Sequence, residues 1–177
     1  MNLENIKPDI RHLKDMKNVV YDQEWFKTAP EDLELYYMYR GLKEKDNLRY
    51  DITIIPPRML GKEYVKTKGH NHPEKEEYIV LEGEAIFLIQ DGKEIIKDVY
   101  AVKAKKGDKV IIPPEYDGHV TINPTNQELK LANWIAKDFK HDYSVIERMK
   151  GASYFYTTDG WIKNKNYKQV PELRFDN

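Results

Sequence analysis

The stretch HNHPEKEEYIVLEG, from His70 to Gly83, decides the fold of this chain. Side chains of a β-strand alternate between its two faces, so His70 and His72 point the same way. Imidazole is the commonest metal ligand, and a carboxylate such as that of Glu76 is its usual harder companion. We therefore predict most of a metal site in this stretch and expect a further histidine ligand from a distant strand.

The composition limits the class of protein. The 177 residues suit one domain, and the formal net charge of -1 gives no reason to expect nucleic acid or an anionic membrane as partner. The chain has no cysteine, which excludes disulfides, thiolate metal sites and cysteine nucleophiles. Residues 1–18 lack the apolar core of a secretory signal, and no apolar run approaches the ~20 residues of a membrane span. We expect a cytoplasmic protein.

Short β-rich runs separated by turn signals dominate the chain after residue 32. The predicted strands lie within residues 33–41, 48–57, 76–83, 84–90, 94–104, 109–114, 118–127 and 129–136. Strands of this length, with a turn signal every 8–12 residues or so, indicate an all-β sandwich or barrel.

The remaining local signals predict small helical additions and a last hairpin. Asp22 is expected to cap a short helix that Pro30 ends. A second helix is expected in residues 142–151, where Ser144 and Glu147 have the spacing of a capping box. Residues 153–163 predict a hairpin that turns at Asp159-Gly160, and the polar residues after Asn166 are expected to fray.

A second segment supplies the missing ligand. Residues 107–123, GDKVIIPPEYDGHVTIN, contain a glycine turn, a short apolar strand, a proline stop and His119. If this segment forms a second hairpin that packs against the first inside a barrel, His119 reaches the predicted metal site. Three imidazoles and one carboxylate suit Fe, Mn, Ni, Zn or Co and leave open positions for a substrate.

The two segments together resemble the paired motifs of the cupin superfamily. HxHx3Ex6G lies at residues 70–83 and Gx5P…Hx3N at residues 107–123. The resemblance implies a cupin double-stranded β-helix, or jelly-roll barrel, with a short N-terminal arm. We expect one cupin domain over residues 1–177, divided into an arm at 1–30, a barrel at about 31–140 and a C-terminal helix and hairpin at 141–177.

The cupin motif also implies which acidic residue is the ligand. Its six-residue gap before Gly83 favours Glu76 over Glu74 and Glu77, and strand parity agrees, because Glu76 and Tyr78 share a face. The second motif departs from the usual pattern. Two prolines precede Glu115, which replaces the usual glycine, so we expect the turn that leads to His119 to be one residue longer.

A narrower resemblance, over residues 11–162, links the chain to cupin-type phosphoglucose isomerases. These enzymes carry Thr-Lys-Gly-His-x-His, as in residues 67–72, and then Glu-x-Tyr, as in residues 76–78. Further similar segments are LYYMYRG, RYDITIIPPRMLGKEY and KHDYSVIERMKG. The resemblance implies a metal-dependent aldose–ketose isomerase that interconverts glucose 6-phosphate and fructose 6-phosphate in glycolysis and gluconeogenesis.

The resemblance also implies roles for individual side chains. It implies one divalent metal ion per subunit, iron foremost, with Mn, Ni, Zn or Co as alternatives. The implied metal ligands are His70, His72, Glu76 and His119. The implied catalytic residues are Glu76, Tyr78 and His141. The implied substrate contacts are Tyr36, Thr53, Thr67, Gly69 and Tyr143, and we expect Lys62 or Lys68 to add charge near the phosphate.

One position departs from this family. Six residues before His141 the family often has a tyrosine that touches the phosphate, and Ile135 stands there in this chain. We therefore expect either a different way of holding the phosphate or a related sugar phosphate as substrate.

Two other functions of a cupin fit the ligand set, because the fold alone does not give the function. One is a non-enzymatic sugar-phosphate-binding cupin, and the other is a metal-dependent cupin oxygenase. The absence of a helix-turn-helix pattern and of a basic patch counts against a regulator, and the Thr-Lys-Gly segment counts against an oxygenase. We expect a small-molecule sugar phosphate as ligand, no nucleic-acid or membrane partner and, by analogy with other cupins, a homodimer.

Overall fold

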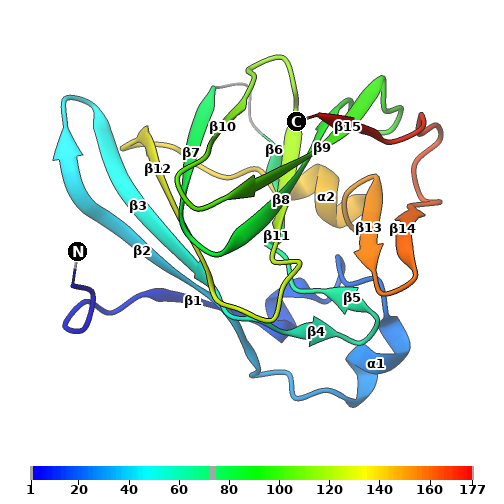
Figure 1. The fold of residues 1–177 in the computed structure, drawn as a ribbon. Coiled ribbons are helices and arrows are strands. Elements are labelled where there is room, and N and C mark those ends of the chain that lie inside the picture. Colours follow the sequence, from blue (N-terminus) through cyan, green and yellow to red (C-terminus); the bar gives the residue numbers. More distant parts are fainter. Residues whose placement is uncertain (1, 72–74, 177) are drawn as a thin grey trace.

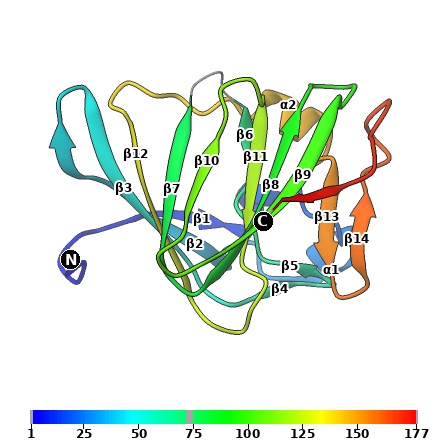
Figure 2. The same ribbon diagram turned by 45° about the horizontal axis from the view of Figure 1, so that its top comes forward.

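Two β-sheets wrap around a common interior in the computed structural model, which describes residues 2–71 and 75–176 (Figures 1 and 2). Of the residues discussed above, His72 and Glu74 lie outside the described ones. The first sheet has the strand order β1-β2-β3-β12-β7-β10, and the second has the order β15-β9-β8-β11-β6. A smaller sheet has the order β14-β13-β5-β4.

The strands of the first sheet are β1 (Asp9–His12), β2 (Glu34–Lys45), β3 (Leu48–Ile55), β12 (Leu129–Ala136), β7 (Glu76–Glu82) and β10 (Lys109–Ile112). Those of the second are β15 (Arg174–Asp176), β9 (Asp98–Lys105), β8 (Glu84–Asp91), β11 (Gly118–Ile122) and β6 (His70–Asn71). The small sheet consists of β14 (Gly160–Lys163), β13 (Tyr154–Thr157), β5 (Glu63–Tyr64) and β4 (Met59–Leu60). The helices are η1 (Leu13–Met16, a 3-10 turn), α1 (Gln23–Thr28) and α2 (Ser144–Arg148).

Strands far apart in the sequence pair within both main sheets. In the first sheet β12 lies between β3 and β7, and in the second β11 lies between β8 and β6. From β7 onward the chain passes from the first sheet (β7) to the second (β8 and β9), back to the first (β10), to the second (β11) and to the first again (β12), as in the double-stranded β-helix of a cupin. The predicted all-β cupin fold is confirmed.

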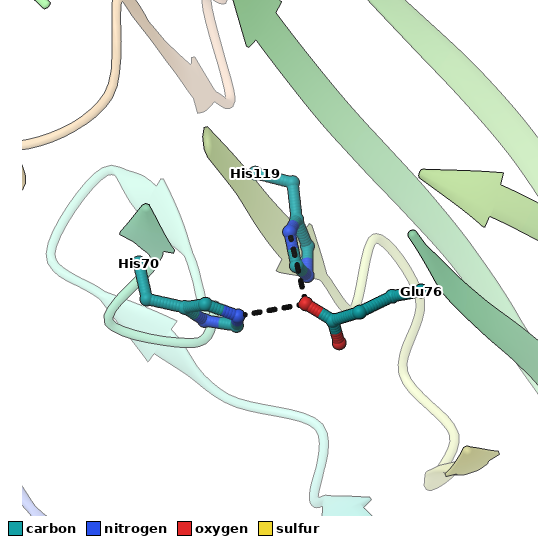
Figure 3. Close-up of side chains that lie close together, drawn as sticks. All are labelled: His70, Glu76 and His119. Carbon is teal, nitrogen blue, oxygen red and sulfur yellow. Dashed lines mark hydrogen bonds and ion pairs between the residues drawn. The ribbon is translucent and has the colours of Figure 1, made fainter. Parts of the chain in front are cut away.

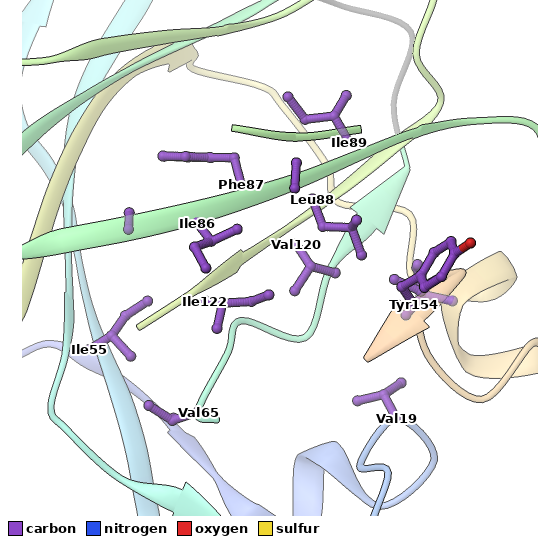
Figure 4. Close-up of a cluster of buried hydrophobic side chains, with 14 of the residues drawn as sticks. Val19, Ile55, Val65, Ile86, Phe87, Leu88, Ile89, Val120, Ile122 and Tyr154 are labelled. Carbon is purple, nitrogen blue, oxygen red and sulfur yellow. The ribbon is translucent and has the colours of Figure 1, made fainter. Parts of the chain in front are cut away.

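The interior between the sheets is filled by aliphatic and aromatic side chains. In β7 the side chains of Glu76, Tyr78 and Val80 are buried while Glu77 is exposed, as period-2 alternation requires. Figure 4 shows part of this core, in which β8 and β11 contribute Ile86, Leu88, Val120 and Ile122.

The first predicted helix is confirmed, but the cap of the second is wrong. Asp22 accepts a hydrogen bond from the Trp25 N–H at 3.0 Å at the start of α1. In α2, Ser144 is already helical and makes no cap hydrogen bond. The Asp142 carboxylate accepts the Ser144 N–H at 2.9 Å, because this carboxylate precedes the helix and lies closer to its free N–H groups.

The C-terminal segment does not fray, contrary to prediction. Tyr167 is buried and donates its hydroxyl to the Gly151 carbonyl at 2.9 Å. Strand β15 then pairs in parallel with β9, and Arg174 contacts both carboxylate oxygens of Asp98 at 3.0 and 2.6 Å. These contacts are distant in sequence, so the polar composition of the segment alone gave no sign of them.

Within residues 2–71 and 75–176, no helix has the length and apolar character needed to cross a bilayer.

Candidate functional site

Three predicted metal ligands meet inside the barrel. His70 on β6 and His119 on β11 are opposite each other in the second sheet, so their rings lie 4.5 Å apart between centroids. Glu76 at the start of β7 reaches them from the first sheet (Figure 3). Its Oε1 lies 3.0 Å from His70 Nε2 and 4.0 Å from His119 Nδ1.

These three side chains suit a divalent metal ion. One ligand atom from each lies within 4.8 Å of the others, and all three residues are buried. Two imidazoles and a carboxylate are ligands that Fe, Mn, Co, Ni and Zn accept. The fourth predicted ligand, His72, lies outside the described residues.

The second carboxylate oxygen of Glu76 has different partners. Oε2 accepts a short hydrogen bond from the Tyr78 hydroxyl, and the Asn133 amide donates to the same oxygen at 3.4 Å. Burial, and then the charge of Glu76, raises the pKa of Tyr78 well above its usual value. Tyr78 therefore stays protonated at neutral pH and remains a hydrogen-bond donor beside the candidate metal site.

The predicted substrate contacts all line one cavity next to this cluster. The cavity wall includes residues predicted to contact the substrate or to act in catalysis, namely Tyr36, Thr53, Thr67, Gly69, Tyr78, His141 and Tyr143. Ile135 also faces the cavity. Lys68 lines it, whereas Lys62 is exposed and lies 3.8 Å from Asp159 in an ion pair, so of the two lysines only Lys68 is part of the cavity wall.

Strand register explains why these side chains face the same space. Met38 on β2 is opposite Thr53 on β3, and Thr53 is opposite Leu131 on β12. One row further along, Asp51 is opposite Asn133, which is opposite Tyr78. Each strand therefore contributes every second residue to the cavity wall.

The segment before His70 brings hydrogen-bond donors to the cavity. The Thr67 Oγ1 accepts the Thr121 N–H at 3.0 Å, which leaves the hydroxyl proton of Thr67 for another acceptor. Gly69 has φ +81°, and a Cβ at this position would lie 2.7 Å from the Val120 side chain. Only glycine fits this turn, so the close approach of β6 to β11 depends on Gly69.

His141 belongs to an aromatic group at the edge of the metal cluster. Its ring lies 4.4 Å from that of His70 and is stacked on Tyr143 at 5.7 Å. Burial, and then the nearby His70, lowers the pKa of His141 to about 3. Its imidazole is therefore neutral at physiological pH and offers one donor and one acceptor nitrogen.

Three charged or amide residues of the cavity wall did not follow from the sequence motifs. They are Arg40, Asp51 and Asn133. The Asp51 carboxylate accepts the Gly41 N–H at 2.8 Å and lies 3.8 Å from the Arg40 guanidinium. Strand alternation could have predicted that they face the cavity, since each lies two or four residues from Tyr36, Thr53 or Ile135 on the same strand.

The fold and the site together define a cupin with a candidate metal centre inside its barrel. A family model described as Glucose-6-phosphate isomerase (GPI) matches residues 10–172. The chain is 31% identical over 152 residues to the glucose-6-phosphate isomerase of Thermococcus litoralis, with 81% of this chain and 77% of that protein covered. For the Pyrococcus horikoshii enzyme of the same name the identity is 28% over 169 residues, with 91% and 87% covered.

The chain belongs to the glucose-6-phosphate isomerase family. Among solved structures, Peruvianin-I, described as a cysteine peptidase from Thevetia peruviana latex, is similar with a TM-score of 0.50 and 17% identity. The similarity covers 72% of this chain and 78% of that one. At this identity the similarity concerns the fold alone.

Proposed function

We propose that this protein interconverts glucose 6-phosphate and fructose 6-phosphate. The family match over residues 10–172 carries the proposal. The cavity supports it, because the candidate metal cluster and the side chains that the family resemblance implies for substrate binding surround one space.

We propose one divalent metal ion per subunit, held by His70, Glu76 and His119 with His72 as the fourth ligand. Iron is our first choice, with Mn, Ni, Zn and Co as alternatives. When bound, such an ion supplies a Lewis acid for the oxygens on C1 and C2 of the sugar.

The phosphate is assigned to the wall that carries Thr53, Thr67 and Gly69. Hydroxyl and backbone N–H groups are suitable donors for a phosphate dianion. Lys68 is 9% exposed, lines the same wall and forms a short ion pair with Glu147. Its ammonium group adds positive charge at this end of the cavity.

Two routes for hydrogen transfer are compatible with this arrangement. In the first, Glu76 removes the C2 proton of the open-chain aldose, and the electrons of that bond form the C1–C2 double bond of a cis-enediol as O1 gains a proton. Return of a proton to C1 as O2 loses its own gives the ketose. Tyr78 donates a hydrogen bond throughout. In the second route a hydride moves directly from C2 to C1 while the O2 proton is passed to O1, so no base is needed at carbon.

Reaction in D2O distinguishes the two routes. Deuterium enters the sugar at C1 or C2 when Glu76 exchanges its proton with solvent, and direct transfer introduces none. A parallel measurement with Glu76→Gln links any incorporation to this carboxylate.

The proposed activity is tested with a coupled assay that converts fructose 6-phosphate to glucose 6-phosphate. The protein is measured after treatment with chelator and after addition of each divalent metal in turn. Activity that is lost with chelator and restored by a metal supports the proposal. An inactive protein with every metal tested would refute it.

We also propose that the protein is a homodimer that pairs through the outer face of the first sheet. Trp134, Ile111 and Leu48 on this face are 38%, 47% and 40% exposed. Trp134 packs on Tyr50 of the neighbouring strand at 5.1 Å. Glu77 lies between Trp134 and Ile111 on this face, and a second copy of the chain would cover these apolar side chains around it.

A further inference from the structure

Arg11 on β1 lies behind one end of the cavity wall. β1 pairs with β2 so that Arg11 is opposite Tyr36. The guanidinium carbon lies 5.9 Å from the Tyr36 ring centroid and 5.5 Å from that of Tyr143. The Arg11 Nη2 donates a hydrogen bond to the Tyr143 hydroxyl at 3.3 Å. Arg11 thus contacts two phenols that line the cavity without lining it itself.

The charge of Arg11 is not neutralised by a contacting acid. Among the described residues, no carboxylate lies within ion-pair distance of its guanidinium. Its Nε is buried and has no hydrogen-bond partner within that part of the chain. A partly buried cation with an unpaired N–H costs stability, so fold stability alone does not explain this residue.

The hydrogen bonds of the two phenols leave their protons for a ligand. A tyrosine hydroxyl donates one hydrogen and accepts through its oxygen. The Tyr143 oxygen accepts from Arg11, and the Tyr36 oxygen accepts the backbone N–H of Lys68 at 3.1 Å. Because protein donors occupy the acceptor side of both oxygens, both O–H groups are available to point into the cavity.

The same end of the cavity carries two cationic side chains. The Lys68 ammonium lies 4.8 Å from the centroid of the Tyr143 ring and is paired with Glu147. The charge of Asp15 also acts on Arg11, but its carboxylate is outside ion-pair distance of the guanidinium. Two phenolic donors in front of a guanidinium that no described carboxylate contacts suit a dianion better than a neutral hydroxyl group.

We propose that Arg11 is a positioning residue for the phosphate group of the substrate. It holds Tyr143 and Tyr36 as hydrogen-bond donors and supplies the counter-charge behind them. This inference rests on the proposed function for its substrate, a sugar phosphate. The anion recognition itself does not depend on turnover.

The test compares Arg11→Met and Arg11→Lys with the wild type, and uses Arg148→Met on α2 as a control for loss of one positive charge. The Arg148 side chain is 54% exposed and lies outside the cavity wall. Two quantities are measured for each protein. The first is the pair KM and kcat for fructose 6-phosphate. The second is the Kd of inorganic phosphate from titration calorimetry.

Arg11→Met should raise both KM and the phosphate Kd by about 10- to 100-fold, as expected when a charge-assisted interaction is lost. The kcat should change by less than about threefold. The reason is that the phosphate contact stabilises the bound substrate and the transition state equally, so its loss raises KM alone. Arg11→Lys should recover part of the phosphate affinity, and Arg148→Met should match the wild type.

An unchanged phosphate Kd in a folded Arg11→Met protein would overturn the inference, as would a fall in kcat with KM unchanged. If Arg11→Met does not fold, Arg11→Lys and Tyr143→Phe are combined in a double-mutant cycle. Additive effects on phosphate Kd then contradict the proposed contact. If the wild type binds phosphate through Arg11 yet fails to isomerise the sugar, only the proposed function is lost.

Discussion

Tyr78 donates its phenolic hydrogen to Glu76 Oε2, while Glu76 Oε1 faces His70 at 3.0 Å. The two residues are separated by one position on β7 and therefore share the cavity face of the strand. Tyr78 thus fixes the orientation of the carboxylate, and its own raised pKa keeps it a donor. One side of Glu76 is directed to the candidate metal and the other to a hydrogen-bond donor.

Removal of this donor should slow the reaction without loss of metal. Tyr78→Phe keeps the ring and deletes the hydroxyl that orients the Glu76 carboxylate, so we expect kcat to fall by about 100-fold, within the range that a positioned acid–base group contributes. Steady-state kinetics and elemental analysis of the purified protein check this. Tyr64→Phe, in a ring stacked at 4.9 Å on Tyr156 in the small sheet, is the control. An equal kcat in the Tyr78 and Tyr64 variants would contradict the role of Tyr78.

Metal binding should stabilise the protein through the buried cluster. A ligand that binds only the folded state at about 100 times its Kd adds about 2.7 kcal/mol of stability, which corresponds to a rise in Tm of roughly 5–10 °C for a chain of this size. The rise should be seen in a thermal melt after a divalent metal is added to chelator-treated wild type. It should be absent in His70→Ala and in His72→Ala.

His12 provides the control for these histidine variants, because it lies on β1 and has no place in the cluster. His12→Ala should keep the full metal-dependent rise. A rise of wild-type size in His70→Ala would exclude His70 as a ligand.

A charge among the exposed apolar side chains of the first sheet's outer face should separate the proposed dimer. Trp134→Asp places a charge in the centre of the outer face, which opposes its burial against a second copy. We expect light scattering after size exclusion to give half the wild-type mass. Phe175→Asp, an exposed aromatic on β15 of the other sheet, should leave the mass unchanged. A dimeric Trp134→Asp protein would place the interface elsewhere.

The attachment of the C-terminal strand should weaken in strong acid. Hydrogen bonds from Arg174 and Tyr116 lower the pKa of Asp98 from its usual 3.8 to about 2. Since the folded pKa lies below the unfolded one, the ionised carboxylate stabilises the fold above about pH 4, and this contribution is lost as pH falls towards 2. Asp98 is one-third exposed, so we expect no more than about 1 kcal/mol at neutral pH.

Urea unfolding of wild type and Asp98→Asn at pH 7 and at pH 2–3 measures this contribution. The difference in free energy of unfolding should be present at pH 7 and shrink at the lower pH. Asp159→Asn, an exposed carboxylate, controls for the general effect of charge. A difference that grows in acid would contradict the assignment to Asp98.

Local sequence patterns were sufficient to predict the parts of the site that lie along one strand or within one motif. The alternation on β7 placed Glu76 and Tyr78 on one face, and the two cupin motifs brought His119 to His70. Alternation along β2 and β3 likewise turns Arg40 and Asp51 towards the cavity, but nothing in the motifs marked them as polar wall residues. The motif implied Gly69 only as a substrate contact, and its left-handed turn against Val120 followed from the structure.

Contacts between elements distant in sequence were decided only in the tertiary structure. The residue opposite Tyr36 depends on the register of β1 against β2, and a shift of one residue would turn Arg11 away from both phenols. The pairing of β15 with β9 depends likewise on Arg174 meeting Asp98, 76 residues away. By itself the sequence determined which side chains share a strand face, because that periodicity is local. Which faces meet, and which charges remain unpaired when they do, depends on strand register and packing.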